Sequence, residues 1–343
     1  MGSMRVAILR PVRAWKEEPG LSLTSQIDSP DSPFTRFTAL HLPRPRAAMD
    51  TYRATARAAQ RPVSLPTPPP GVRPAWGTLG AAIDHRLRYA FTCHRVIDGA
   101  VREGVASAAA WCAGMRRADV AGAILATGRD LESELRLLLK RDRPDDRSRP
   151  MLLAAAAEER LARLCVTMVW FEEVYRSGVL YPGSAIVRLA AELTLPALLA
   201  QVPDYMVDDV TAQVRLAQDA LGELRAGTKA EECYSGPVFA GSRAVGGADA
   251  DLIAGRLLLD FKALKDPVRL PPAAAYQLAG YALLDFEDLY RLERVGFYLT
   301  RSGQLITWGL GEFAGLLGAQ VPVPELRTEL SGRLASEDPD AEA

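Results

Sequence analysis

The chain has 343 residues, of which 48% are hydrophobic and 24% are charged. This composition is typical of a globular protein, and the length allows two or three structural units. Forty-one basic residues against 42 acidic ones give a net charge of -1, which excludes a global positive field, so any contact with nucleic acid must use a local basic patch.

The sequence carries neither a secretory signal nor a run approaching the ~18 apolar residues of a membrane span. We therefore expect a cytoplasmic protein with no membrane partner. Its four cysteines, Cys93, Cys112, Cys165 and Cys233, lie far apart and form no C-x-x-C pair. This spacing argues against a zinc knuckle and favours buried free thiols.

In chain order, residues 1–75 are expected to form an N-terminal strand followed by a Pro-rich extended segment. Residues 22–73 are rich in Pro, Ser, Thr and Arg, which predicts a poorly helical connector. Residues 76–232 are predicted to be mainly helical, because Ala, Leu, Arg and Glu recur at helical spacing. Breaks at 142–150 and 181–183 divide this region into five or six helices.

From residue 233 to residue 320 the pattern changes to short apolar runs separated by glycine. A Pro pair opens a helix between the third and fourth run, over residues 271–284. This order predicts an α+β (α/β) fold with a mixed central sheet flanked by helices. A short helix is expected at 311–317, and residues 321–343 should hold a C-terminal helix and an acidic tail. The predicted strands are 238–245, 248–253, 256–263, 295–300 and 304–308.

Residues 247–262 have the pattern of a tight hairpin that carries four charged side chains of interest. Side chains alternate along a strand, so Asp249 and Asp251 share one face of the first strand. Asp260 and Lys262 share one face of the next strand for the same reason. The hairpin therefore gathers carboxylates beside one lysine.

The position of the turn decides which aspartate lies opposite Asp260. A two-residue turn at 254–255 places Asp249 there, whereas a Gly-first turn at 255–256 places Asp251 there instead. The sequence leaves both registers open.

Burying such charges is costly unless they are paired or bind a cation, and oxygen ligands suit Mg²⁺ or Mn²⁺. A metal held by these aspartates would polarise a phosphodiester and acidify a bound water. Lys262 would position that water or stabilise the developing negative charge. The plainer interpretation is an acidic hairpin face in solvent, with Lys262 in a surface ion pair.

The hairpin resembles the PD-(D/E)XK nuclease superfamily, in which an Asp near the end of one strand precedes an Asp/Glu-x-Lys on the next. The RecB-like branch adds a Gln-x-x-x-Tyr on the following helix, and Gln277 and Tyr281 match it, one turn apart. The resemblance implies a restriction-endonuclease-like core over residues 233–320, in which these two residues contact DNA or support the active site. Packing of the helix on the sheet is the alternative role.

A further match lies upstream, where residues 80–88 are similar to the RecB-like Gly-x-x-x-His followed by x-x-Leu-Glu. Asp84 stands at the His position and Arg88 at the Glu position, while His85 lies one place later, roughly 100 degrees around the helix. Asp84 is therefore the expected additional ligand. The resemblance then implies the metal-ligand set Asp84, Asp249, Asp251 and Asp260. Because the cysteines lack the expected cluster of three, no iron-sulfur cluster is predicted.

Arg301 begins a predicted tight turn between the last two strands, where a phosphate contact would complete a substrate-binding set with Gln277 and Tyr281. Glu172 and Glu173 are expected on a helix surface. The leading hypothesis is a Mg²⁺- or Mn²⁺-dependent deoxyribonuclease, with DNA favoured over RNA by resemblance. The alternative is a nuclease-like module that binds nucleic acid or a protein partner without cutting, in a defence or repair complex. Such a protein partner could dock on the helical region.

Overall fold

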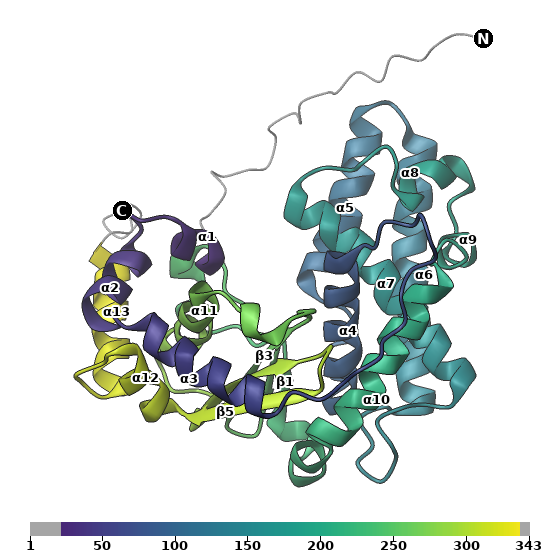
Figure 1. Ribbon diagram of the computed structural model, residues 1–343. Coiled ribbons are helices and arrows are strands. Elements are labelled where there is room, and N and C mark those ends of the chain that lie inside the picture. The colour runs from purple at the N-terminus through teal and green to yellow at the C-terminus, as the bar shows by residue number, and fades with distance from the viewer. Residues whose placement is uncertain (1–21, 337–343) are drawn as a thin grey trace.

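The computed structural model describes residues 22–336, in which thirteen α-helices and five β-strands form a mixed α+β fold. The sheet lies between two groups of helices, one formed by the two ends of the chain and the other by its middle (Figure 1). The predicted α+β class is confirmed at this level. The N-terminal strand and the acidic tail that the sequence predicts fall outside the described residues.

The extended connector predicted over residues 22–73 is wrong for most of its length. Three helices occupy it, namely α1 (Leu23–Asp28), α2 (Pro33–His41) and α3 (Pro45–Ala58). Ser22 and Ser32 cap the first two by accepting hydrogen bonds from main-chain N–H groups, and Pro33 occupies the first turn of α2. Ser22, Ser32, Pro33 and Pro45, which contributed to the extended prediction, thus mark helix starts.

The middle of the chain forms seven α-helices, where five or six were predicted. The excess comes from α8 and α9, two short helices of five residues each after the predicted break at 181–183. Helices α5 and α7 approach closely at Gly104, where a Cβ atom would lie 1.9 Å from the carbonyl oxygen of Phe171. The helices are α4 (Trp76–Phe91), α5 (Gly99–Gly114), α6 (Ala118–Asp142), α7 (Ala155–Ser177), α8 (Ala185–Leu189), α9 (Leu195–Leu199) and α10 (Asp204–Gly227).

The sheet has the strand order β1-β2-β3-β4-β5, and helix α11 (Pro272–Leu283) connects β3 to β4. β3 and β4 are parallel, and the other neighbouring pairs are antiparallel. After β5 the chain forms α12 (Leu310–Leu317) and α13 (Val323–Ser336). The strands are β1 (Cys233–Ser235), β2 (Leu252–Ala254), β3 (Leu257–Lys262), β4 (Arg294–Leu299) and β5 (Gln304–Gly309).

The first predicted strand, residues 238–245, is not a strand. The segment makes a single bridge, between Val238 and Asp249, and ends in the 3-10 turn Arg243–Val245. Ser242 explains the difference, since its hydroxyl accepts a hydrogen bond from Phe239 N and donates one to the Ala248 carbonyl. This local bonding competes with strand pairing. The first strand of the sheet is instead β1, a few residues earlier.

The hairpin turn lies at 255–256, which resolves the two registers left open by the sequence. Leu252 faces Leu259 and Ala254 faces Leu257. Gly255 has φ +60°, a conformation that glycine adopts without the steric penalty of a side chain. The residue carried toward Asp260 is therefore Asp251.

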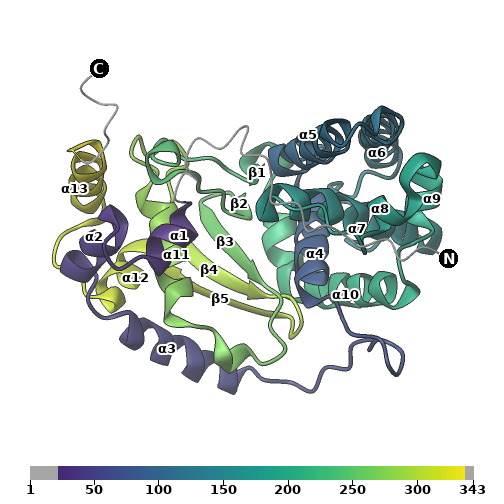
Figure 2. The ribbon, with the colours of Figure 1, turned by 90° about the horizontal axis from the view of Figure 1, so that it is seen from above.

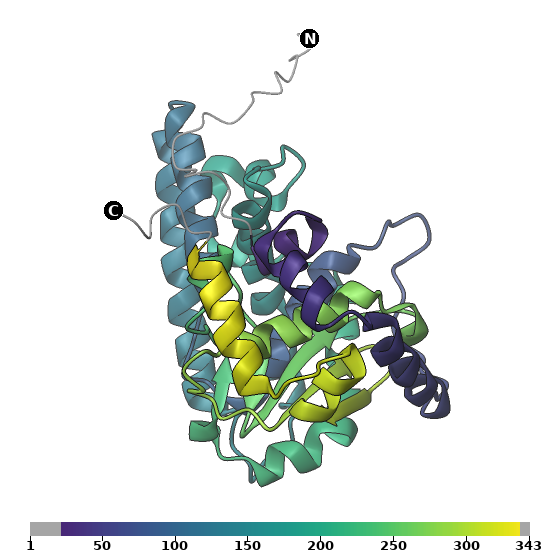
Figure 3. The ribbon, with the colours of Figure 1, turned by 90° about the vertical axis from the view of Figure 1, so that its left-hand side faces the viewer.

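Alternation along β3 divides the core into two parts. Leu257 and Leu259 pack with helices α4 to α10, whereas Leu258 packs with the terminal helices and α11 on the other face. Figure 2 shows these helix groups on opposite sides of the sheet. In Figure 3 the purple α1 to α3 and the yellow α12 and α13 lie together, in agreement with the contacts of α3 with α12 and of α2 with α13. No helix of the described part of the chain is long and apolar enough to span a membrane.

Candidate functional site

The carboxyl end of β3 carries a connected row of polar side chains. Nζ of Lys262 lies 2.8 Å from Oδ2 of Asp260 and donates a hydrogen bond of 2.9 Å to Oε1 of Gln277. Nε2 of Gln277 in turn donates to the Tyr281 hydroxyl at 3.0 Å. The side chains that the sequence places on β3 and on α11 thus meet at one point, because α11 packs against the same face of the sheet.

Asp251 joins this row just before β2. Its Oδ2 accepts a hydrogen bond of 2.5 Å from Phe261 N, and its negative charge raises the pKa of Asp260. Its Oδ1 lies 3.3 Å from the Arg88 guanidinium. Asp251 therefore links the β3 row to helix α4.

Arg88 is a buried cation shared by three carboxylates. Its Nε donates to Oδ1 of Asp84 at 2.9 Å, and its Nη2 also contacts Asp84. Its Nη1 donates to Oδ2 of Asp98 at 2.8 Å, and its third partner is Asp251. Asp84, the expected additional metal ligand, is consequently ion-paired inside the protein.

Burial dominates the electrostatics of the row. It raises the pKa of Asp260 to about 7, with Lys262 opposing the shift and Asp251 adding to it. Burial lowers the pKa of Lys262, but the carboxylates of Asp260 and Asp251 outweigh it and the net shift is upward. Tyr281 has its pKa raised well above the usual range, chiefly by burial. At Asp260, burial therefore outweighs the charge of the neighbouring Lys262 ammonium.

A second cluster adjoins Arg88 and was missed by sequence reasoning. Nε2 of His85 lies 2.8 Å from Oε2 of Glu172, and Nδ1 lies 3.6 Å from Asp98. Burial opposes ionisation of Glu172, yet the hydrogen bond and charge of His85 lower its pKa to about 2. Glu172 was expected on a helix surface, and only the packing of α7 on α4 brings it to His85. No local signal in the sequence marks this pair.

Two predicted site residues, both in the described part of the chain, form no hydrogen bond or ion pair with the row. Asp249 is exposed and makes its bridge to Val238 rather than facing Asp260. Arg301 donates to both carboxylate oxygens of the buried Asp209, each at 2.9 Å, and its guanidinium lies 4.8 Å from the centre of the Trp76 ring. The structure thus gives Arg301 partners on α10 and α4.

The fit of a metal ion depends on which of these carboxylates remain available. No group of three or more His, Cys, Asp or Glu side chains in the described residues is arranged to hold a metal. Mg²⁺, however, commonly uses one or two carboxylates together with water and substrate phosphates. Asp251 and Asp260 supply such a pair, and the buried Oδ2 of Asp260 has the Lys262 ammonium as its neighbour at 2.8 Å. The pair fits a hard cation, while Asp84 and Asp249 do not extend it.

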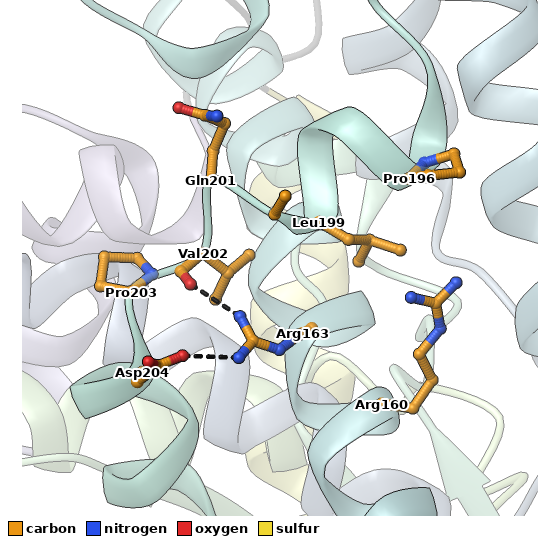
Figure 4. A pocket seen from close by; sticks show the side chains of 9 residues that line it. Arg160, Arg163, Pro196, Leu199, Gln201, Val202, Pro203 and Asp204 are labelled. Carbon is orange, nitrogen blue, oxygen red and sulfur yellow. Dashed lines mark hydrogen bonds and ion pairs between the residues drawn. The ribbon is translucent and has the colours of Figure 1, made fainter.

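A separate hollow of about 530 Å³ lies on the helical side of the molecule, lined by α7, α9 and the start of α10 (Figure 4). Its Arg163 donates to the Val202 carbonyl at 2.8 Å and to Asp204 at 2.6 Å. Arg163 precedes Glu172 by nine residues on α7, which corresponds to ~14 Å along a helix. The hollow is thus distinct from the β3 row, and both of its arginines are already paired, Arg160 with Glu134 and Arg163 with Asp204.

Comparisons of the chain with protein-family models, with curated proteins and with solved structures give no match.

Proposed function

We propose that the chain is a Mg²⁺- or Mn²⁺-dependent nuclease that hydrolyses phosphodiester bonds, in DNA by preference, on a restriction-endonuclease-like core. One observation carries the proposal: direct contacts join Asp260, Lys262, Gln277 and Tyr281, and the Asp251 charge acts on Asp260. These residues come from three separate segments of the chain, and the sequence pattern alone predicts each of them as a site residue. The element order of three strands, helix and two strands supports the same core.

In this proposal Asp251 and Asp260 would hold the cation, which would polarise the phosphodiester and acidify a water. Asp260 and Asp251 bring two carboxyl groups near the single Lys262 ammonium, and a bound cation would offset the cost of burying them. Lys262 keeps its proton, so its role is to orient the attacking water or to stabilise negative charge on the phosphate. Gln277 and Tyr281 hold the ammonium group in place through their shared hydrogen bonds.

Cleavage of labelled DNA with and without added Mn²⁺ tests the proposal. We expect cleavage by the unaltered protein, its loss in EDTA, and its loss in Asp260→Asn and in Lys262→Met. Lys265→Met is the matched control, because this lysine is exposed and lies three residues farther along the chain. Full cleavage by both site variants, or none by the unaltered protein with either metal, would rule out the proposal.

Arg88 favours a second candidate function, a nuclease-like module that binds nucleic acid or a protein partner without cutting. Its guanidinium already neutralises Asp84, Asp98 and Asp251 in part, as a bound cation would. Calorimetric titration with Mn²⁺ separates the two candidates. Saturable heat that disappears in Asp260→Asn supports the nuclease, whereas absence of heat in the unaltered protein supports the binding module.

A further inference from the structure

Four aromatic rings lead from the candidate site to the surface, and we call them the aromatic row. Tyr281 stacks on Phe239, with the ring centroids 6.1 Å apart and the planes at 26°. Phe239 meets Tyr290 edge to face at 5.5 Å, and Tyr290 meets Tyr234 in the same way at 5.0 Å. The row therefore begins at the hydrogen-bonded Gln277–Tyr281 pair and ends on the edge strand β1.

The outer end of the aromatic row is unusually exposed. Tyr234 keeps 45% of its surface accessible, Val238 51% and Leu289 68%, whereas Phe239, the ring next to Tyr281, is buried. The Tyr290 hydroxyl donates to the Val238 carbonyl at 2.9 Å, which fixes the ring that supports Tyr234. Exposed apolar groups gathered in this way mark a binding surface more often than scattered ones do.

A cation flanks the row between its outer end and the carboxylates. Nη1 of Arg95 donates to the Gly236 carbonyl at 2.8 Å, two residues beyond Tyr234. The side chain of Arg95 is 43% exposed, and its ion-pair distance to Asp98 is long, at 4.0 Å. Burial raises the pKa of Tyr290 and the Arg95 charge opposes that shift, as expected for a guanidinium near the ring.

We propose that the aromatic row binds the unstacked bases of a single-stranded nucleic acid, with Arg95 at the backbone phosphate. Flat rings with an open face, beside a guanidinium, are the elements that hold single strands without sequence preference. A duplex keeps its base faces covered, so it offers nothing to Tyr234. The binding of the strand is independent of the proposed nuclease function. The further step, in which the strand continues to Lys262 and is cleaved, rests on that function.

A peptide strand pairing with the β1 edge is the competing occupant of this surface. β1 spans three residues, Cys233–Ser235, so it offers a short ladder to such a partner. Strand pairing would use the main chain of β1 rather than the faces of its rings. The effect of removing the Tyr234 ring therefore separates the two occupants.

Fluorescence anisotropy with a labelled oligothymidylate of about 15 nucleotides tests the proposal, with the matching duplex in parallel. The Asp260→Asn background keeps the probe intact whether or not the protein is a nuclease. We expect Tyr234→Ala to weaken single-strand binding roughly 5- to 100-fold, since base stacking on a ring contributes that much. Tyr234→Phe should bind as the background does. Tyr181→Ala, which removes a 59% exposed tyrosine from the loop between α7 and α8, is the matched control.

Photocrosslinking of a bromouracil-containing strand to the unaltered protein gives a measurement that needs no variant, and adducts on Tyr234 or Tyr290 are expected. Three results would overturn the inference. Tyr234→Ala could bind the single strand unchanged, the duplex could bind as tightly as the single strand without dependence on Tyr234, or no oligonucleotide could bind at all. Tyr234-dependent binding, together with no DNA cleavage by the unaltered protein, would uphold the aromatic row and reject the nuclease. Cleavage with Tyr234-independent binding would do the reverse.

Discussion

The ion pair between Arg301 and Asp209 gives a prediction whose size follows from the structure. Asp209 is fully buried on α10 and also accepts a hydrogen bond from Gln213. Arg301 reaches it from the turn after β4, while its guanidinium covers the Trp76 ring. The pair therefore joins the sheet to helices α10 and α4.

Replacing Arg301 with methionine leaves the Asp209 carboxylate buried without its cation. Removing one partner of a buried pair costs about 3–5 kcal/mol of unfolding free energy. The double variant Arg301→Met/Asp209→Asn should cost at least ~2 kcal/mol less than Arg301→Met alone, because no charge is then left unpaired. The asparagine retains an oxygen for Gln213.

Equilibrium unfolding in urea at neutral pH measures all three free energies, and the anisotropy assay with the oligonucleotide provides the second readout. We expect Arg301→Met to lose stability and to keep its affinity for the strand at temperatures where it remains folded. A loss below ~1 kcal/mol, together with weakened strand binding, would refute the reasoning and restore the phosphate contact predicted from the sequence.

Three further predictions concern the helical side. His85 should have a pKa above the usual ~6.5, because Glu172 outweighs the effect of burial. The ion pair of His85 then stabilises the fold fully below pH ~6.5, and this stabilisation declines as the pH rises through the folded pKa. Imidazole NMR, with His85→Gln as the assignment control, would measure that pKa. Glu172, with its pKa lowered to about 2, should lose its stabilisation as the pH falls from ~4.5 toward that value. Gly104→Ala should destabilise by ~1–3 kcal/mol through its clash with the Phe171 carbonyl, whereas Gly114→Ala, with open space around it, should not; equal thermal stability of the two would contradict the close approach of α5 and α7.

Local rules determined much of what the sequence predicted. The Pro pair and the helical spacing that follows it indicated α11, and alternation along β3 put Asp260 and Lys262 on one face. The runs at 295–300 and 304–308 correspond closely to β4 and β5. Each of these depends on residues a few positions apart, which is the range over which helix and strand periodicity acts.

Tertiary structure alone decided the partners of the charged residues. The choice of Asp251 over Asp249 came from the left-handed conformation at Gly255, and the pairing of Arg301 with Asp209 joins residues 92 positions apart. Arg88, read from the sequence only as a departure from a motif, became a cation shared by three carboxylates when α4 packed beside the hairpin. A buried charge needs a counter-charge close by in space, and the sequence alone does not show which charged residues the fold brings together.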